Sequence, residues 1–208
     1  TEFLRAAGFT SVNFDLMYGL PGQSVDDLQA TLDTTIKLAP SRIALFGYAH
    51  MPQLFPRQRR IDDSNLPGSA ERFAMAQLGY RQLTWAGYIA IGFDHFALPN
   101  DSLSIAAAQG ELHRNFQGFT DDGCATMIGL GASAISNFPG YIIQNEKNPD
   151  QYRSLALAQM VTASRGVQRL PDDRLRGALI EKLLCSGNSG PIPEYILATA
   201  MTGLAAFV

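Results

Sequence analysis

Polar side chains that could do chemistry gather near the ends of predicted strands. Asp15 lies near the end of one strand, His50 follows a second, and Asp94 and His95 follow a third. His113 lies in a further polar segment, so all three histidines of the chain belong to this set. Such carboxylates and imidazoles either ligate Zn²⁺ or a metal pair, or line a pocket for an organic cofactor and substrate. Both interpretations stay open, because the chain contains neither His-x-His nor His-Glu-x-x-His.

Each of these residues, taken alone, has an ordinary structural explanation. A carboxylate inside a strand is often a hydrogen-bonded structural group, and a single histidine is more often packed than catalytic. The shared position of the set is what favours a common site. In barrels and open parallel α/β folds, active sites lie at the carboxyl ends of the strands.

Three strands and two helices must position these side chains. Residues 11–17 alternate between apolar and polar side chains, which predicts a strand with one polar face. Ser24 caps the helix that follows, with Asp27 in the capping-box position, and Pro40 ends it. Residues 42–49 form the second predicted strand. The buried stripe of the first helix is expected to be Val25, Leu28, Leu32 and Ile36.

A second helix is predicted for residues 69–86, and a third strand for residues 88–93. The order strand–helix–strand–helix–strand favours parallel strands joined by right-handed crossovers. Asn100 or Asp101 caps a short further helix that ends at about Gly110. The side chains of the second helix that are expected to face inward are Phe73, Ala76, Tyr80 and Leu83.

Beyond residue 97 the periodicity weakens, and a helix begins again at Asp172 or Asp173. We therefore expect a domain change near residue 168, with residues 1–168 as a barrel part and residues 169–208 as the start of a helical domain. The chain has no initiating Met, and residues 196–208 stop inside a helical pattern. We expect the chain to be a piece of a longer protein.

Composition limits the function classes. Hydrophobic residues make up 46% and charged residues 17% of the 208 residues, which is a globular balance. A formal net charge of -3 gives no general electrostatic reason to bind nucleic acid. The apolar stretch at 196–208 is shorter than the roughly 20 residues that a membrane span needs. Two widely separated cysteines form no disulfide framework and fit a cytoplasmic location.

Four segments of the chain resemble one enzyme family. They are FTSVNFDLMYGLPGQ at residues 9–23, YAHMP at 48–52, GFDHFA at 92–97 and LHRNFQGFT at 112–120. They resemble the oxygen-independent coproporphyrinogen III oxidases, the dehydrogenases of bacterial haem synthesis in the radical S-adenosylmethionine (SAM) superfamily. The last segment is the most specific. The resemblance implies an α/β fold: the C-terminal strands and helices of a (β/α) radical-SAM barrel, followed by the start of a small helical domain.

The resemblance also implies a reaction and its cofactors. Two propionate side chains of coproporphyrinogen III would undergo oxidative decarboxylation to vinyl groups, giving protoporphyrinogen IX. A 5′-deoxyadenosyl radical from SAM would start each decarboxylation, and no electron acceptor is implied. No catalytic side chain is singled out. By similarity, the residues that contact SAM are Asp15, Phe46, Ala49, Gln117 and Ile135.

A tetra-anionic substrate calls for cationic partners, and Arg suits carboxylates because its planar fork binds both oxygens. Arg114 lies in the most specific segment, and Arg57 follows the second strand. Arg57 shares its loop with Arg59 and Arg60, so a solvated surface loop is the simpler explanation for it.

The Cys-x-x-x-Cys-x-x-Cys motif, which binds the family's [4Fe–4S] cluster, is absent from the chain. Cys124 and Cys185 cannot replace it, because the cluster needs three closely set thiolates. We expect the motif to lie upstream of residue 1, so that the chain alone binds no cluster and is inactive.

Two alternatives stay open. One is a haem-trafficking protein that uses the same barrel, against which the segment at 113–120 argues. The other is a metal-dependent barrel hydrolase that uses Asp15, His50, His95 and His113.

Overall fold

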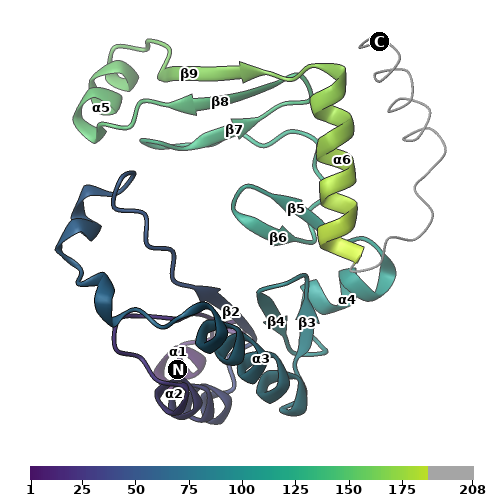
Figure 1. Ribbon diagram of the computed structural model, residues 1–208. Coiled ribbons are helices and arrows are strands. Elements are labelled where there is room, and N and C mark those ends of the chain that lie inside the picture. Colours follow the sequence, from purple (N-terminus) through teal and green to yellow (C-terminus); the bar gives the residue numbers. More distant parts are fainter. Residues whose placement is uncertain (187–208) are drawn as a thin grey trace, which may run out of the picture. The chain divides into compact units, whose positions relative to one another are not determined.

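The computed structural model describes residues 1–186 as two compact units, each with a sheet of its own (Figure 1). The first unit comprises Thr1–Leu112 with Gln117–Asp121, and the second comprises His113–Phe116 and the described residues 122–186. Within the described residues, no helix is both long and apolar enough to cross a membrane.

The first unit is built on a four-stranded sheet of order β1-β2-β4-β3, in which β1 and β2 are parallel as predicted. Its strands are β1 (Asn13–Tyr18), β2 (Arg42–Gly47), β3 (Ile89–Ile91) and β4 (His95–Ala97), and β6 (Gly118–Thr120) also belongs to this unit. Its α-helices are α1 (Glu2–Ala6), α2 (Val25–Leu38), α3 (Ser69–Trp85) and α4 (Ser102–Gln109). Two 3₁₀ turns, η1 (Pro56–Arg60) and η2 (Asp63–Asn65), lie between β2 and α3.

The third strand, predicted for residues 88–93, differs from the structure in its length and in its pairing. Residues 88–93 do not form one parallel strand: β3 ends at Ile91, and the chain reverses into β4, which runs antiparallel to both β3 and β2. Gly92 lies at this chain reversal with φ of +63°, a backbone conformation that glycine adopts without strain and that is unfavourable for other residues. β4 thus lies between β2 and β3, and His95 is a strand residue instead of following a strand.

Helix α2 begins and ends where the sequence predicts. The Ser24 hydroxyl accepts from the Asp27 N–H at 3.1 Å, and Asp27 Oδ2 accepts from the Ser24 N–H at 2.9 Å, which completes the capping box. The Ser24 hydroxyl also donates to Asp27, and these hydrogen bonds lower the pKa of that carboxyl. Ala39 closes the helix in the left-handed conformation, directly before Pro40.

Helix α3 buries a different face from the one predicted. Phe73 and Tyr80 were expected to face inward, but they are 64% and 55% exposed, whereas Leu83 is buried as expected. The buried face carries Gly79 instead, where a Cβ atom would lie 2.2 Å from Leu45 Cδ2. The missing side chain lets the helix lie close against β2. Close packing at this glycine therefore outweighs the apolar area of the two aromatic rings.

The core of the first unit lies between one face of the sheet and helices α2 and α3. Its buried members are Leu28, Leu32, Ile43, Leu45, Met75, Leu83, Tyr88 and Phe96, and Val25 and Ile36 pack against them. The predicted stripe of α2 is thus confirmed. The Tyr88 hydroxyl donates to the Pro40 carbonyl at 2.8 Å, and burial raises the pKa of this phenol.

The second unit contains a three-stranded antiparallel sheet in a region for which the sequence predicts no regular element. Its strands are β7 (Ile135–Asn137), β8 (Tyr141–Asn145) and β9 (Ala163–Gln168), and it also includes the short strand β5 (His113–Asn115). Its helices are α5 (Pro149–Leu157) and α6 (Pro171–Ser186). Helix α6 is the helix expected to begin at Asp172 or Asp173.

The predicted domain change near residue 168 falls between β9 and α6, inside the second compact unit. The division between the two units lies earlier, around residues 112–122. A helical domain that begins at residue 169 stays a prediction, and the helical pattern at 196–208 lies outside the described residues.

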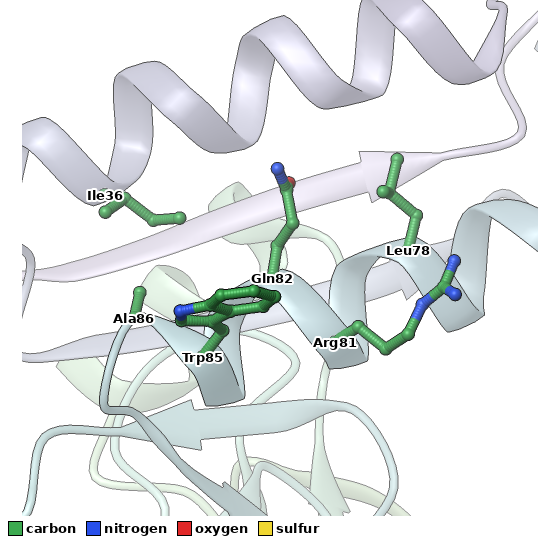
Figure 2. Close-up of a pocket in the computed structure, with 6 residues that line it drawn as sticks. All are labelled: Ile36, Leu78, Arg81, Gln82, Trp85 and Ala86. Carbon is green, nitrogen blue, oxygen red and sulfur yellow. The ribbon is translucent and has the colours of Figure 1, made fainter.

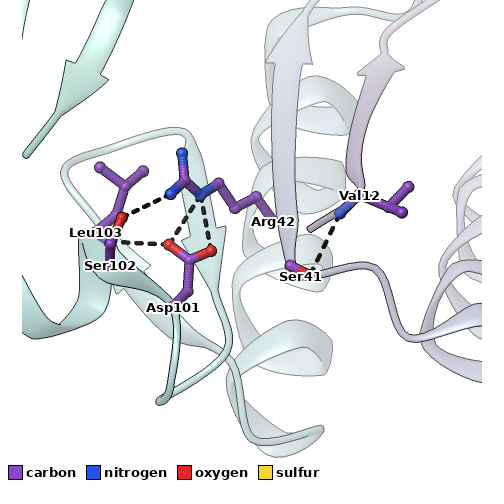
Figure 3. Close-up of polar contacts among 6 residues, drawn as sticks. All are labelled: Val12, Ser41, Arg42, Asp101, Ser102 and Leu103. Atoms are coloured by element: carbon purple, nitrogen blue, oxygen red, sulfur yellow. Dashed lines mark hydrogen bonds and ion pairs between the residues drawn. The ribbon is translucent and has the colours of Figure 1, made fainter. Parts of the chain in front are cut away.

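An ion pair joins the start of β2 to α4 (Figure 3). Arg42 Nε donates to both carboxylate oxygens of Asp101 at 2.8 Å, and Arg42 Nη2 donates to Ser102 Oγ at 2.9 Å. Asp101 is 8% exposed and also accepts from the Leu103 N–H at 2.9 Å, so the same carboxylate caps α4 as predicted.

Asp101→Asn separates these two roles, because Asn caps helices as well as Asp but carries no charge. We expect it to lower the free energy of unfolding by about 1–3 kcal/mol, since Arg42 keeps a partly buried charge without a counter-ion. Urea unfolding of Asp101→Asn, Arg42→Met and the double variant measures the coupling. Strictly additive losses would contradict a stabilising pair.

Candidate functional site

The sheet of the first unit has a second face, which we call the inner face because it points away from α2 and α3. Asp15 pairs with Ala44 in the β1–β2 register, and Ala44 pairs with His95 in the β2–β4 register. Directly paired residues project from the same side of a sheet, so Asp15 and His95 share the inner face. Phe46, two residues after Ala44, lies on that face too. The structure thus collects an acid, an imidazole and an aromatic ring from three strands.

His95 is held by one carboxylate and two aromatic rings. Its Nδ1 lies 2.6 Å from Asp94 Oδ1, and 19% of its side chain is exposed. Phe46 and Phe119 meet the imidazole edge-on, with ring centroids 5.9 and 5.3 Å away. These contacts fix the ring orientation and leave Nε2 without a hydrogen bond to any of residues 1–186. The sequence singles out Asp94 and His95, but no pattern identifies Phe119 as their neighbour.

Asp15 has spare acceptor capacity. Its Oδ1 accepts from Asn13 Nδ2 at 2.8 Å, whereas Oδ2 has no hydrogen bond within the described part of the chain. The side chain is exposed on the inner face. A carboxylate in this state can accept hydrogen bonds from the hydroxyl groups of a ligand.

The segment after β2 is anchored at the carboxyl end of the sheet. β2 ends at Gly47, and the Tyr48 N–H then donates to the Tyr18 carbonyl at 2.8 Å. The Tyr48 hydroxyl lies 3.2 Å from Nδ1 of His50. Because the strand ends before Ala49, the alternation that would put Phe46 and Ala49 on opposite faces does not apply. His50 lies at the strand end as the sequence predicts.

Gln58 of η1 forms hydrogen bonds to the backbone of this segment through both the nitrogen and the oxygen of its side-chain amide. Its Nε2 donates to the Ala49 carbonyl at 3.0 Å, and its Oε1 accepts from the Met51 N–H at 2.6 Å. Sequence reasoning missed Gln58, because a glutamine in a polar loop carries no pattern that reveals a contact nine residues away.

The other predicted ligand contacts fall in both units. In the first unit, Gln117 precedes β6 with an exposed side chain, and the exposed side chain of Arg57 on η1 forms no hydrogen bond with the described residues. In the second unit, Ile135 begins β7 opposite Gln144, and Arg114 lies in β5. The exposure of Arg57 agrees with the solvated-loop explanation.

In the second unit, close backbone packing explains why Gly129 is a glycine in the segment Gly129-x-Gly131. A Cβ at Gly129 would lie 2.6 Å from the Ile135 carbonyl oxygen, so only glycine permits this backbone approach. The Asn145 amide donates to the carbonyls of Gly129 and Gly131 at 3.2 and 3.0 Å. These contacts hold the chain that leads into Ile135.

Helix α6 is tied to β5 by one carboxylate. Glu181 Oε1 lies 3.1 Å from Nδ1 of His113 and accepts from the Arg114 N–H at 3.2 Å. Burial and the nearby Glu181 carboxylate raise the pKa of the Cys185 thiol to about 11. Among residues 1–186, no three His, Cys, Asp or Glu side chains are grouped so that they could hold a metal ion, and this includes the set predicted for a hydrolase.

A separate hollow of about 420 Å³ lies between α2 and α3, on the side of the sheet opposite the inner face (Figure 2). Trp85 stands in its wall with 93% exposure, and the Gln82 amide reaches toward α2, where it donates to Asp33 at 3.4 Å. Among the described residues, no acid or histidine lines it. The inner face and the carboxyl ends of β1 and β2 therefore remain the candidate site. The lining residues are Ile36, Leu78, Arg81, Gln82, Trp85 and Ala86.

Comparison with known proteins relates the chain to one group of enzymes. It is 44% identical over 184 residues to an oxygen-independent coproporphyrinogen III oxidase of Cereibacter sphaeroides, covering 88% of this chain and 41% of that protein. The Escherichia coli protein of the same name is 41% identical over 182 residues, covering 88% and 40%. The chain thus spans about two fifths of the length of these relatives. No family model matches the chain.

A solved structure agrees with the sequence comparison. The coproporphyrinogen III oxidase of Escherichia coli, described as a radical SAM enzyme, superposes with a TM-score of 0.83 at 40% identity. The match covers 89% of this chain and 43% of that one. The predicted α/β class and partial radical-SAM barrel are therefore confirmed.

The turn at Gly92 supports the wall of the inner face and can be tested. A Cβ at this position would lie 2.0 Å from Phe119 Cζ, so Gly92→Ala must displace the ring that packs against His95. We expect a loss of about 1–3 kcal/mol in the free energy of unfolding from overpacking and backbone strain. Gly87→Ala is the matched control, because Gly87 also has positive φ but nothing within 4 Å of its Cβ position. Equal losses in thermal unfolding would refute the packing role of Gly92.

The raised pKa of Cys185 predicts slow alkylation. In a Cys124→Ser background, the rate with iodoacetamide should keep rising between pH 8 and 10, with its midpoint near pH 11, because the thiolate is the reactive form. The raised pKa also means that this thiol stabilises the fold below pH 9 and that the contribution is lost as pH rises toward 11. Urea-unfolded chain, with a midpoint near the ordinary value, is the control. A folded-state midpoint near pH 8.5 would contradict the burial of the thiol.

Proposed function

The chain is homologous to part of the oxygen-independent coproporphyrinogen III oxidases, and we propose that the protein to which it belongs converts coproporphyrinogen III to protoporphyrinogen IX. The supporting observation is 41–44% identity to proteins of that name over 88% of the chain. In this reaction each of two propionate side chains loses one hydrogen atom, one electron and CO₂, and becomes a vinyl group. The hydrogen atom passes to the 5′-deoxyadenosyl radical formed from SAM, and the electron passes to an external one-electron acceptor.

The inner face fits SAM, which when bound supplies the radical that takes a hydrogen atom from the substrate. Asp15 offers a carboxylate oxygen without a partner in residues 1–186, which suits ribose hydroxyl groups. Phe46 supplies an apolar wall, and Ala49 presents backbone just past the carboxyl end of β2. Gln117 and Ile135 are further proposed contacts to the nucleotide.

The task of these residues is to hold the reacting groups in place and keep water away. A substrate hydrogen must lie close to the radical carbon, and small displacements are costly in rate. Phe46, Phe119 and the fixed His95 ring give a rigid wall for this purpose. Gln58 keeps the Ala49 carbonyl in place and is therefore a positioning residue of this proposal.

A [4Fe–4S] cluster is a second group that radical SAM enzymes use, and the described residues do not supply its ligands. Cys124 and Cys185 are free cysteines of the second unit, and no third thiol accompanies them. No step is therefore assigned to cluster ligands of this chain. Free thiols agree with the cytoplasmic location that we propose.

The two alternatives are not favoured. Proteins at 41–44% identity carry the name of the oxidase, and the solved neighbour is described as a radical SAM enzyme. Neither a haem-trafficking role nor a metal-dependent hydrolysis has an observation of its own in its favour.

An assay of the full-length protein tests the proposal. The anaerobically purified protein, reduced and supplied with SAM, should convert coproporphyrinogen III to a divinyl product that oxidation turns into fluorescent protoporphyrin IX. The 208-residue chain alone should bind no cluster and form no product, because it contains two cysteines. A full-length protein that holds iron and sulfide, binds SAM and still forms no vinyl product would overturn the proposal.

Asp15→Asn in the full-length protein should weaken SAM binding by roughly 10–100-fold, because hydrogen bonds to a charged acceptor are stronger than those to an amide. Asp26→Asn, at an exposed position in the first turn of α2, is the matched control and should leave the affinity unchanged. Equilibrium dialysis with labelled SAM gives both constants. Unchanged affinity in Asp15→Asn would remove Asp15 from the proposed site.

A further inference from the structure

Arg72, in the first turn of α3, lies against the carboxyl ends of β1 and β2. Its Nη1 is 3.2 Å from the point where a Cβ of Gly19 would lie, and its Nη2 is 3.2 Å from the equivalent point at Gly47. Gly19 directly follows β1, and Gly47 is the last residue of β2. The guanidinium therefore occupies space that two glycines leave free. The Tyr18 ring lies at the same place, 3.1 Å from the Cβ position of Gly47.

The charge of Arg72 is not matched within the described chain. The first unit has two partly buried arginines, Arg42 and Arg72. Arg42 forms an ion pair with Asp101, whereas the side chain of Arg72 forms no hydrogen bond or ion pair with any of residues 1–186, and only its backbone N–H is bonded, to the Gly68 carbonyl. Even Glu71, beside it on the helix, forms no ion pair with it. Partial burial of an unmatched guanidinium is unfavourable, which suggests that the partner is a ligand.

The location and chemistry of Arg72 point to one ligand class. The carboxyl ends of parallel strands are where active sites form in barrels, and Ala49 and His50 lie at the end of β2. Arginine presents a planar fork that matches a carboxylate and cannot lose its proton. We propose that Arg72 binds a carboxylate of a ligand at this end of the sheet, an inference that rests on the proposed function for the identity of that ligand.

Two ligands of the proposed reaction carry carboxylates: the porphyrinogen through its propionates, and SAM through its methionine part. The test uses the reconstituted full-length protein with two probes. Coproporphyrin III binding is followed by fluorescence quenching, and SAM binding by equilibrium dialysis. Arg72→Met should weaken one of the two by about 10–100-fold, and the affected probe identifies the source.

Matched controls separate binding from folding. Arg81→Met, on the same helix but lining the hollow of Figure 2, should change neither affinity. Arg72→Lys keeps the charge without the fork and should recover part of the lost affinity. If the porphyrin is the ligand, its tetramethyl ester, which has no free carboxylate, should bind wild type and Arg72→Met equally.

The outcomes are distinct from those of the activity assay. Affinities for both probes within twofold of wild type in Arg72→Met and Arg72→Lys, with unchanged thermal unfolding, would overturn the inference. So would a loss of affinity in Arg72→Met that is equally large for the tetramethyl ester, because that would indicate a structural role. Failure of the wild type to form vinyl product would refute the proposed function, while the binding measurements would still decide the role of Arg72.

Discussion

The parallel pairing of β1 with β2 is the constraint on which the first unit depends. Its register fixes which side chains share a face: Leu16 and Leu45 face the helices, and Asp15 and Ala44 face inward. A shift of one residue would exchange the two sets, because side chains alternate along a strand. Burial of Ile43 and Leu45 against α2 and α3 holds the register, so the hydrophobic core also positions the polar site.

Glycines set how closely the elements around this pair approach. Gly79 lets α3 lie against Leu45, and Gly92 leaves room for Phe119 against the inner face. Gly19 and Gly47 leave the space that the Arg72 guanidinium occupies. In each case the absence of a glycine side chain leaves room for a residue that is distant in the sequence. The presence of a glycine therefore does not reveal which residue packs against it.

The two partly buried arginines of the first unit show how charge and position combine. Arg42, at the amino end of β2, forms an ion pair with Asp101, whose carboxylate also caps α4. This ion pair links the amino end of β2 to α4. Arg72 lies at the opposite end of the same strand without such a partner within residues 1–186. At the amino end of β2, the charge of Arg42 is neutralised by Asp101, and the pair has a structural role. The proposed ligand contacts lie at the carboxyl end, where the charge of Arg72 has no such partner within residues 1–186.

The sequence by itself determined the elements that depend on local rules. Ser24 and Asp27 predict the start of α2, Asp101 predicts the cap of α4, and alternation predicts β1, because caps and alternation involve residues close in sequence. The segment around His113 also predicts a resemblance to the oxygen-independent coproporphyrinogen III oxidases, and the chain is 44% identical to one protein of that name over 184 residues. Only the tertiary structure decided that β4 turns back beside β2, that α3 buries Gly79 instead of Phe73, and that Phe119 and Gln58 support the site. These outcomes depend on contacts between distant residues, where close packing overrides local hydrophobic pattern.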